Sequence, residues 1–265
     1  MCIRDSPKII FIRTASYGGF KSILLKTAKE NGILIGEFQH GIIYESHMAY
    51  NYGDAIFESE HYKKYLPDYI LTYGDYWNDK IKIPSKILTI GNPHFYESIK
   101  KYKDIKEQKD SILIISQGTL TDKFVNIAKY LSEKLPNYRI LFKLHPGEVP
   151  FEGRYKELYK CVNVELAKSG DIYEYLAQFE YIVACYSTTI FESLGFNKKL
   201  FILDNEMSKK NIPEDIGVRF KENKELKDLI LNTKELNLNY NLEYYFNPNW
   251  KENYKEFLRT EVGIK

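Results

Sequence analysis

The sequence has no long apolar run and few cysteines. No segment approaches the ~18–20 consecutive apolar residues that span a bilayer, and the opening residues, MCIRDS, lack the apolar core of a signal peptide. The three cysteines, Cys2, Cys161 and Cys185, show no metal-binding spacing such as C-x-x-C and cannot all pair with one another. We therefore expect a reducing, cytoplasmic location, at most peripheral to the inner membrane.

Several motifs that identify common enzyme classes are also missing. There is no G-x-G-x-x-G or Walker pattern, which disfavours dehydrogenases and P-loop proteins, and no G-x-S-x-G, the commonest hydrolase motif. No D-x-D occurs, so a metal-diphosphate site of that type has no support. We expect no metal and no cofactor.

Charge of one sign is not in excess either. The 265 residues include 38 basic and 36 acidic side chains, for a formal net charge of +2. This near balance gives no general attraction to nucleic acid, so any binding of anions must come from a local site. With 44% hydrophobic and 28% charged residues, the composition is that of a globular protein with one large domain or two small ones.

Short β-branched runs alternate with segments of helical period along the chain. Strands are expected over residues 8–13, 33–38, 69–73, 86–90, 111–116, 139–143, 162–165, 181–184 and 199–203. Helices are expected over residues 20–31, 122–135, 154–159, 171–179 and 189–196. This alternation predicts parallel βαβ units, so the expected fold class is α/β with two Rossmann-like, doubly wound domains.

A charged stretch of low hydrophobicity, residues 96–110, separates two blocks and is the best candidate for an interdomain connection. We expect an acceptor-side domain over residues 1–97 and a nucleotide-binding domain over residues 110–232. A helical segment over residues 239–262 is expected to pack across their junction. Because the first block has only about four strands and begins close to Met1, we expect its domain to be truncated at the N-terminus.

Polar residues end an apolar strand at RILFKLHPGE, residues 139–148. In an open parallel sheet, ligands bind beyond the carboxyl ends of the strands. Alternation puts Lys143 and His145 on one side of this strand, and Pro146 restricts the backbone of the residue before it. An ammonium and an imidazole so placed would clamp a phosphate. The plain alternative is a strand-end turn in which His145 caps a neighbouring carbonyl.

A second cluster lies where the predicted strand 181–184 runs into a helix. Ser187, Thr188 and Thr189 stand at the helix start, whose N–H groups and partial positive charge favour a phosphate. The same hydroxyl groups also suit simple helix capping. Glu192, on the first turns of the helix, either accepts a ribose hydroxyl or acts as a capping carboxylate.

A weaker candidate follows the first strand of the second block. Gly118 and Thr119 come directly after the expected strand 111–116. Their backbone N–H groups would face a phosphate or an acceptor at the same edge of the sheet. We therefore include both residues in the predicted donor site.

In the first block, the expected strand 33–38 delivers Gln39, His40 and Gly41 to its carboxyl end. Histidine is the usual general base near neutral pH, so His40 is the candidate base, with Gln39, Gly41, His47 and His94 as acceptor-side candidates. A lone histidine is more often structural, and that alternative stays open for His40. His94 follows a Gly-Asn-Pro turn signal, and it lines either the cleft or merely the turn.

These clusters, in this order, resemble a two-domain GT-B-type transferase of bacterial surface-polysaccharide synthesis. Residues 111–205 are similar to the donor-binding domain of bacterial sialyltransferases, polysialyltransferases and CDP-glycerol glycerophosphotransferases, through Lys-Leu-His-Pro at 143–146 and Ser-Thr-Thr-Ile-Phe-Glu at 187–192. Gln-His-Gly at 39–41 and Tyr-Gly-Asp-Tyr-Trp at 73–77 are similar to capsule and lipopolysaccharide transferases. The matching motifs extend from 33 to 205.

The resemblance implies that His145, Ser187 and Thr188 contact the donor's phosphate, and that His40 is the base, because the glycerophosphotransferases carry a catalytic His-Gly in a comparable place. It implies an inverting, metal-independent transfer of a sugar, in a cleft between two domains, from a nucleotide-sugar to a glycan or lipid-linked acceptor. The base motif of the sialyltransferases, two acidic residues followed by glycine, is not found in the first block. CMP-sialic acid is therefore not fixed as the donor.

Three alternative functions stay open. The first is CDP-glycerol-type transfer of a polyol phosphate. The second is a non-hydrolysing sugar-nucleotide epimerase, which uses the same architecture but needs acid and base carboxylates around C2 of the sugar, and the sequence offers no convincing pair. The third is an inactive fragment that only binds a nucleotide.

Overall fold

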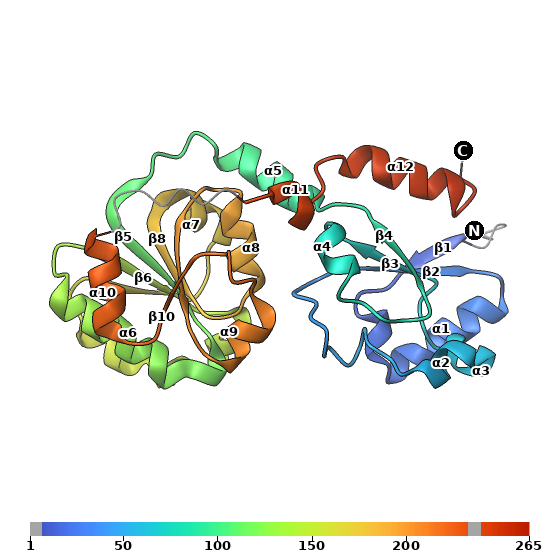
Figure 1. Cartoon of the computed structure of the whole chain (residues 1–265), viewed down its shortest axis with the longest axis horizontal. Helices are drawn as coiled ribbons and strands as arrows, with labels where there is room; N and C mark the ends of the chain where they lie inside the picture. The colour runs from blue at the N-terminus through green and yellow to red at the C-terminus, as the bar shows by residue number, and fades with distance from the viewer. Residues whose placement is uncertain (1–6, 233–239, 265) are drawn as a thin grey trace, which may run out of the picture. The chain divides into compact units, whose positions relative to one another are not determined.

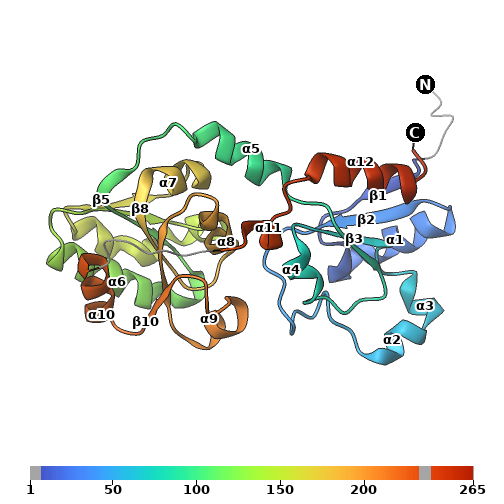
Figure 2. The same cartoon turned by 45° about the horizontal axis from the view of Figure 1, so that its top comes forward.

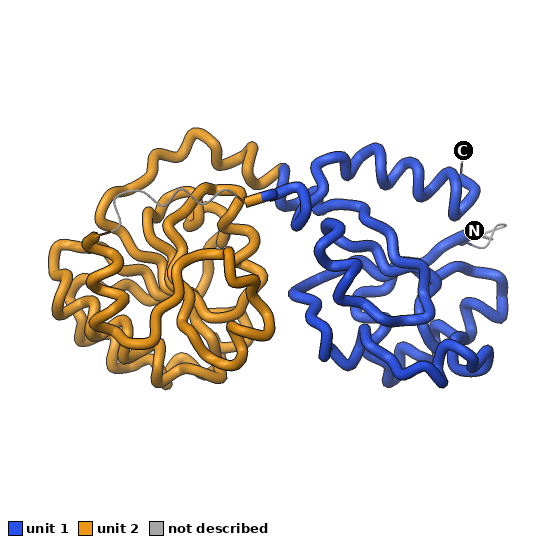
Figure 3. The backbone as a smooth tube through the Cα atoms, viewed as in Figure 1, with its two compact units in different colours: residues 1–96, 241–265 blue, residues 97–240 orange. Residues whose placement is uncertain are grey.

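The computed structural model describes residues 7–232 and 240–264. The chain divides into two compact units, one formed by Met1–Tyr96 with Asn241–Lys265 and the other by Glu97–Tyr240 (Figure 3). The second unit is thus inserted between two segments of the first. No helix among the described residues is long and apolar enough to cross a membrane.

The second unit is built on a six-stranded sheet in which all pairings are parallel (Figure 1). Its strands are β5 (Gln108–Ile115), β6 (Arg139–Lys143), β7 (Val164–Ala167), β8 (Phe179–Ala184), β9 (Lys199–Leu203) and β10 (Val218–Phe220). The spatial order is β10-β9-β8-β5-β6-β7, so the chain builds outward from β5 on one side and then from β8 on the other. The carboxyl ends of β5 and β8 flank the point of reversal, where open α/β sheets bind ligands.

Buried side chains of β5 alternate between the two faces of this sheet. Ile112 and Ile114 join the core with α6 (Thr121–Lys134) and α10 (Asn223–Asn232), while Leu113, also fully buried, points to the opposite face. The remaining helical segments of the unit are η2 (Gly118–Leu120), η3 (Pro146–Lys160), α7 (Ile172–Gln178), α8 (Thr188–Leu194) and α9 (Glu206–Asn211). Burial on both faces explains why the central strands read as continuous apolar runs.

The first unit has a four-stranded parallel sheet. Its strands, β1 (Ile9–Phe11), β2 (Leu34–Phe38), β3 (Tyr69–Thr72) and β4 (Lys86–Thr89), lie side by side in chain order. Its helical segments are η1 (Ala15–Tyr17), α1 (Phe20–Glu30), α2 (Asp54–Glu58), α3 (Glu60–Lys63), α4 (Asp75–Asn78), α11 (Leu242–Tyr245) and α12 (Trp250–Thr260). A further helix, α5 (Pro93–Tyr102), contains the boundary at which the second unit begins.

The two faces of the first sheet are covered by helices from opposite ends of the sequence (Figure 2). Leu25 of α1 packs with Ile35 of β2 on one face. On the other face, Phe257 of α12 packs with Tyr69 and Leu71 of β3. The sequence predicts that residues 239–262 pack across the domain junction. Within this segment, α12 packs against the sheet of the first unit, where its apolar side chains complete that core; residue 239 lies outside the described residues.

The fold class predicted from the sequence, α/β with two Rossmann-like parallel sheets, is confirmed. Each of the nine expected strands corresponds to one of β1 to β9, while β10 is too short to give a periodic signal. Residues 154–159, predicted as an α-helix, belong to the 3₁₀ segment η3, which contains Pro150 and is kinked at Phe151. The expected connection, residues 96–110, holds the end of α5 and the start of β5.

Candidate functional site

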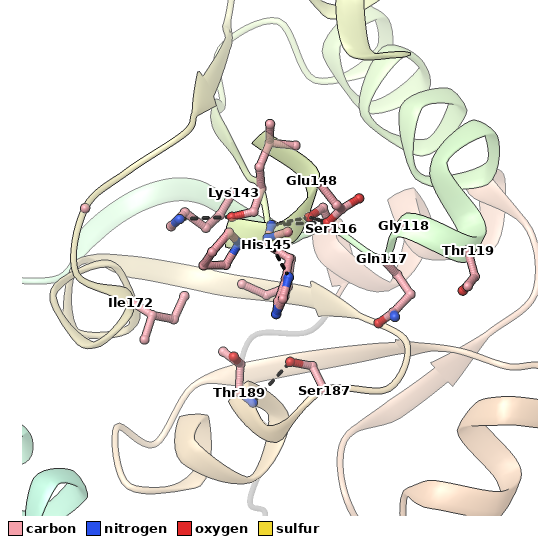
Figure 4. A pocket seen from close by; sticks show the side chains of 15 residues that line it. Ser116, Gln117, Gly118, Thr119, Lys143, His145, Glu148, Ile172, Ser187 and Thr189 are labelled. Carbon is pink, nitrogen blue, oxygen red and sulfur yellow. Dashed lines mark hydrogen bonds between the residues drawn. The ribbon is translucent and has the colours of Figure 1, made fainter. Parts of the chain in front are cut away.

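A pocket of about 580 Å³ opens beyond the carboxyl ends of β5 and β6 in the second unit (Figure 4). Its lining comes from the loop after β5, the junction of β6 with η3, the loop before α7 and the start of α8. The lining residues are Ile115, Ser116, Gln117, Gly118, Thr119, Lys143, Leu144, His145, Pro146, Gly147, Glu148, Gly170, Ile172, Ser187 and Thr189. The pocket therefore lies on the edge of the sheet at which this fold binds ligands.

Most of the predicted donor-site residues line this one pocket, namely Gly118, Thr119, Lys143, His145, Pro146, Ser187 and Thr189. Thr188 and Glu192 do not line it. Tyr173 donates a hydrogen bond to Oε1 of Glu192 at 2.6 Å. Burial raises the pKa of Glu192.

Lys143 ends β6 and is only 7% exposed. Its ammonium donates to the carbonyl oxygen of Leu144 at 3.0 Å, and no described carboxylate lies within ion-pair distance of it. Burial lowers the pKa of Lys143 and is the sole cause of that shift. A buried cation without a carboxylate partner is unfavourable, and an anion bound in the pocket would compensate it.

His145 is held through its backbone and through one ring nitrogen. Its N–H donates to Ser116 Oγ at 2.8 Å and to Glu148 Oε2 at 3.2 Å. The N–H of Gly147 donates to His145 Nδ1 at 3.1 Å. Because Nδ1 accepts, the hydrogen of the neutral ring is on Nε2. The ring points toward the start of α8, so Nε2–H is a donor facing the pocket (Figure 4).

Glu148, which the sequence does not predict as a site residue, lines the pocket and fixes its neighbours there. The residue is 7% exposed, and its carboxylate accepts hydrogen bonds from Ser116 Oγ at 2.5 Å and from the hydroxyl of Tyr155. Together with His145, it completes a capping box at the start of η3. Gly118 packs against it so closely that an added Cβ would lie 3.3 Å from its Oε1. This network fixes the loop after β5 against the end of β6.

The start of α8 presents hydroxyl groups to the pocket. Ser187 is the N-cap residue and accepts a hydrogen bond from the backbone N–H of Thr189 at 3.2 Å. Since a hydroxyl both accepts and donates, Ser187 keeps a hydrogen for a bound anion. Thr119 Oγ1, in η2, shares a hydrogen bond of 2.8 Å with the hydroxyl of Tyr186, the residue before Ser187. The capping interpretation and the anion-binding interpretation of Ser187 are therefore compatible.

In the first unit, His40 follows β2 as predicted. Its Nε2 lies 3.4 Å from the hydroxyl of Tyr17, and its Nδ1 is buried without a hydrogen-bond partner in the described structure. Burial lowers the pKa of His40, with smaller contributions from Arg13, His47 and Lys21. The ring is therefore kept neutral, as a general base requires.

The other acceptor-side candidates in the first unit have different environments. Gln39 is 3% exposed and bonds to the carbonyl oxygen of Gly41 at 2.8 Å and to the N–H of Tyr73 at 2.9 Å, so it fixes the loop. His47 lies beside His40, with its Nε2 3.1 Å from the hydroxyl of Tyr17. His94 is exposed near the start of α5.

A buried carboxylate, Glu37 of β2, lies close to the segment that carries Tyr17, the residue that contacts His40 and His47. The sequence does not predict Glu37 as a site residue. Glu37 is 0% exposed and accepts from the backbone N–H of Ser16 at 2.7 Å and from the hydroxyl of Tyr50 at 2.7 Å. Burial raises the pKa of Glu37. No group of three or more His, Cys, Asp or Glu side chains that could hold a metal ion occurs among residues 7–232 and 240–264.

No protein-family model and no curated protein matches the sequence. The structure is similar to that of the UDP-GlcNAc 2-epimerase of Methanocaldococcus jannaschii, solved with UDP-GlcNAc and UDP. That comparison has a TM-score of 0.63 and 11% identity, and covers 96% of this chain and 76% of the epimerase.

Two transfer enzymes are also similar in structure. The pneumococcal O-GlcNAc transferase GtfA, solved with UDP and GlcNAc, gives a TM-score of 0.55 at 14% identity over 98% of this chain and 58% of its own. The wall teichoic acid polymerase TagF gives a TM-score of 0.53 at 14% identity, and the comparison covers 88% of this chain and 69% of TagF. These similarities show that the chain has the two-unit, GT-B-like fold that these enzymes share.

Proposed function

We propose that the chain is a metal-independent glycosyltransferase that binds a nucleotide-sugar in the pocket of the second unit. The observation that carries this proposal is Lys143, a buried ammonium without a described carboxylate partner, in a pocket that also holds the Nε2–H of His145 and the hydroxyl of Ser187. These are cationic and neutral donors suited to the phosphates of a nucleotide. UDP is named for both of two similar structures, together with UDP-GlcNAc in one and GlcNAc in the other.

In the proposed reaction, these donors stabilise the phosphate that leaves the sugar. Preorganised N–H and O–H groups stabilise developing negative charge without a change in their own arrangement. A single displacement at the anomeric carbon inverts its configuration. His40 of the first unit accepts the proton of the acceptor hydroxyl, and its lowered pKa keeps it in the neutral form that can do so.

The proposed acceptor is a glycan or a lipid-linked glycan of capsule or lipopolysaccharide synthesis, as the sequence resemblance implies. A lipid-linked acceptor would bring the protein to the surface of the inner membrane. Transfer of a polyol phosphate from CDP-glycerol would use the same donor groups, and we keep it as a variant of the proposal. The similarity to TagF supports including it.

A sugar-nucleotide epimerase is the second candidate, supported by the structural similarity to UDP-GlcNAc 2-epimerase. Its chemistry needs an acid and a base on either side of C2. Glu148 is the carboxylate among the described lining residues, and it is already bound by Ser116 and Tyr155. Transferase chemistry does not require such a pair, which is why we favour it.

The test is a panel of CMP-, CDP-, UDP- and GDP-linked donors, screened by the shift in melting temperature that each produces. A ligand that binds only the folded chain at 100 times its Kd stabilises it by about 2.7 kcal/mol. If no donor in the panel raises the melting temperature of the protein, the proposed donor site is excluded. Epimerase activity would appear as exchange of the hydrogen at C2 with solvent deuterium when no acceptor is present.

A further inference from the structure

The hydroxyl of Tyr17 lies between two imidazole rings in the first unit. Its oxygen is 3.4 Å from Nε2 of His40 and 3.1 Å from Nε2 of His47. Tyr17 ends η1, directly after β1, whereas both histidines follow β2, so the contact joins two adjacent loops at the carboxyl edge of the sheet. Tyr17 is 50% exposed, and a bound acceptor can reach it.

The backbone of Ala49 sets the direction of these hydrogen bonds. Its N–H donates to Nδ1 of His47 at 3.3 Å, so that nitrogen carries a lone pair. Burial lowers the pKa of His47 and keeps the ring neutral. Its one hydrogen is therefore on Nε2 and is donated to the oxygen of Tyr17. The hydroxyl hydrogen of Tyr17 is then available to be donated to Nε2 of His40, 3.4 Å away.

The two nitrogens of His40 consequently differ in what they can do. Nδ1 is buried and has no described hydrogen-bond partner. If Nε2 accepts from Tyr17, the hydrogen of the neutral ring is on Nδ1. Nε2 carries the lone pair and faces the hydroxyl of Tyr17. The nitrogen that can accept a proton is thus the one that Tyr17 contacts.

The position of Tyr17 is fixed from below by the buried carboxylate of Glu37. One oxygen of Glu37 accepts from both the N–H and the hydroxyl of Ser16, at 2.7 and 2.5 Å, which holds the residue before Tyr17. The other accepts from the hydroxyl of Tyr50 at 2.7 Å. The ring of Tyr50 lies edge-on to that of Tyr17, with centroids 6.0 Å apart.

We propose that Tyr17 is a catalytic residue that relays the proton of the acceptor hydroxyl to His40; this inference rests on the proposed transferase function. The acceptor gives its proton to the oxygen of Tyr17 while Tyr17 gives its own to Nε2 of His40. The acceptor oxygen forms a bond to the anomeric carbon, and the bond from that carbon to the leaving phosphate oxygen breaks. His40 ends as an imidazolium, Tyr17 as a neutral phenol, and the nucleotide leaves as an anion.

Tyr17→Phe tests the relay, because it keeps the ring and removes the hydroxyl. We expect kcat to fall about 10²-fold, the scale of a lost proton-transfer group, with no change in the melting-temperature shift that the donor produces. Tyr44→Phe is the matched control: its ring also lies against His47, with centroids 5.1 Å apart. Tyr44→Phe also removes a hydroxyl and keeps the ring, but this hydroxyl takes no part in the relay. The variant should therefore keep kcat within about twofold of the wild type.

A second measurement does not depend on turnover. Nitrogen-15 NMR of the histidine rings should show the Nδ1–H tautomer for His40 in the wild type and a tautomer mixture in Tyr17→Phe. An Nε2–H tautomer in the wild type, or equal kcat values for the wild type and Tyr17→Phe, would overturn the relay. If the NMR result holds but no donor in the panel supports transfer, the hydrogen-bond chain stands, and both the proposed transferase function and the catalytic role of Tyr17 fail.

Discussion

The hydroxyl of Tyr50 donates to Oε1 of Glu37 at 2.7 Å, and no cation among the described residues lies within ion-pair distance of that carboxylate. Both side chains are almost completely buried, at 1% and 0% exposure. A buried, unpaired carboxylate is retained at a cost in stability, so its three hydrogen bonds have to compensate for lost hydration. The arrangement places a titratable group directly beneath the loop that carries Tyr17.

The first prediction concerns Glu37 and pH. Burial raises the pKa of Glu37 in the folded chain above the usual 4.5. At a pH between 4.5 and this raised pKa, the unfolded chain has released a proton that the folded chain retains. The free energy of unfolding should therefore decrease as pH rises from about 4.5 through the folded pKa. Glu37→Gln should lose this dependence in urea titrations at a series of pH values. Glu60→Gln, at an exposed side chain on α3, is the control and should keep it.

The second prediction is a trade between stability and binding at Lys143. Lys143→Met removes an unpaired buried charge and should raise the melting temperature of the free protein. The same change should lower the affinity for the nucleotide-sugar donor about 10- to 100-fold, the loss expected for a hydrogen bond to a charged group.

The control for Lys143→Met is Lys199→Met. Lys199 pairs with Glu180 at 2.7 Å and does not line the pocket. Its replacement should lower stability and leave donor affinity unchanged. Calorimetric titration with the donor found in the panel measures both affinities. A Lys143→Met protein that binds the donor as the wild type does would contradict the anion-site assignment.

The third prediction separates the two histidines. His145→Ala removes a donor that faces the pocket, so it should weaken donor binding. His40→Ala removes the base, so it should leave the donor affinity unchanged and reduce kcat by about 10²- to 10⁴-fold. Equal losses of donor affinity in the two variants would show that His40 does not act on the acceptor side.

The fourth prediction concerns the acid limb of the activity profile. Because burial lowers the pKa of His40 below 6.5, the neutral base persists at a pH where an exposed histidine is half protonated. The rate should therefore fall only below pH 6.5. Stability should also fall at acid pH. As pH falls through 6.5, the unfolded chain binds a proton at this residue before the folded chain does, so the free energy of unfolding decreases. His40→Asn should reduce that decrease.

The sequence predicts residues that line the pocket of the second unit where the signal is local. An apolar strand that ends before Pro146 fixes the position of Lys143 and His145, and the bounds of β6 agree with those expected. The hydroxyl residues before a helix likewise predict the start of α8. Parallel topology then brings these strand ends together without further information.

The contacts that the sequence does not predict are those between distant residues. Glu148 reads as part of a turn, and its burial depends on Ser116, which precedes it by 32 positions. The sequence predicts Gln39 as an acceptor-side group. In the structure its side-chain oxygen accepts a hydrogen bond from the backbone N–H of Tyr73, 34 positions later. Tyr17 and Glu37 belong to the same class, because only the pairing of β1 with β2 brings the segment after β1 close to Glu37 of β2.

The division of the first unit between the two ends of the chain has a consequence for biosynthesis. The second unit is complete once residue 240 has left the ribosome, whereas the sheet face that contains Tyr69 and Leu71 waits for Phe257 of α12. The first unit therefore finishes folding after the second, although its sheet precedes the second unit in the sequence. Until then its apolar face is open to chaperones or to aggregation.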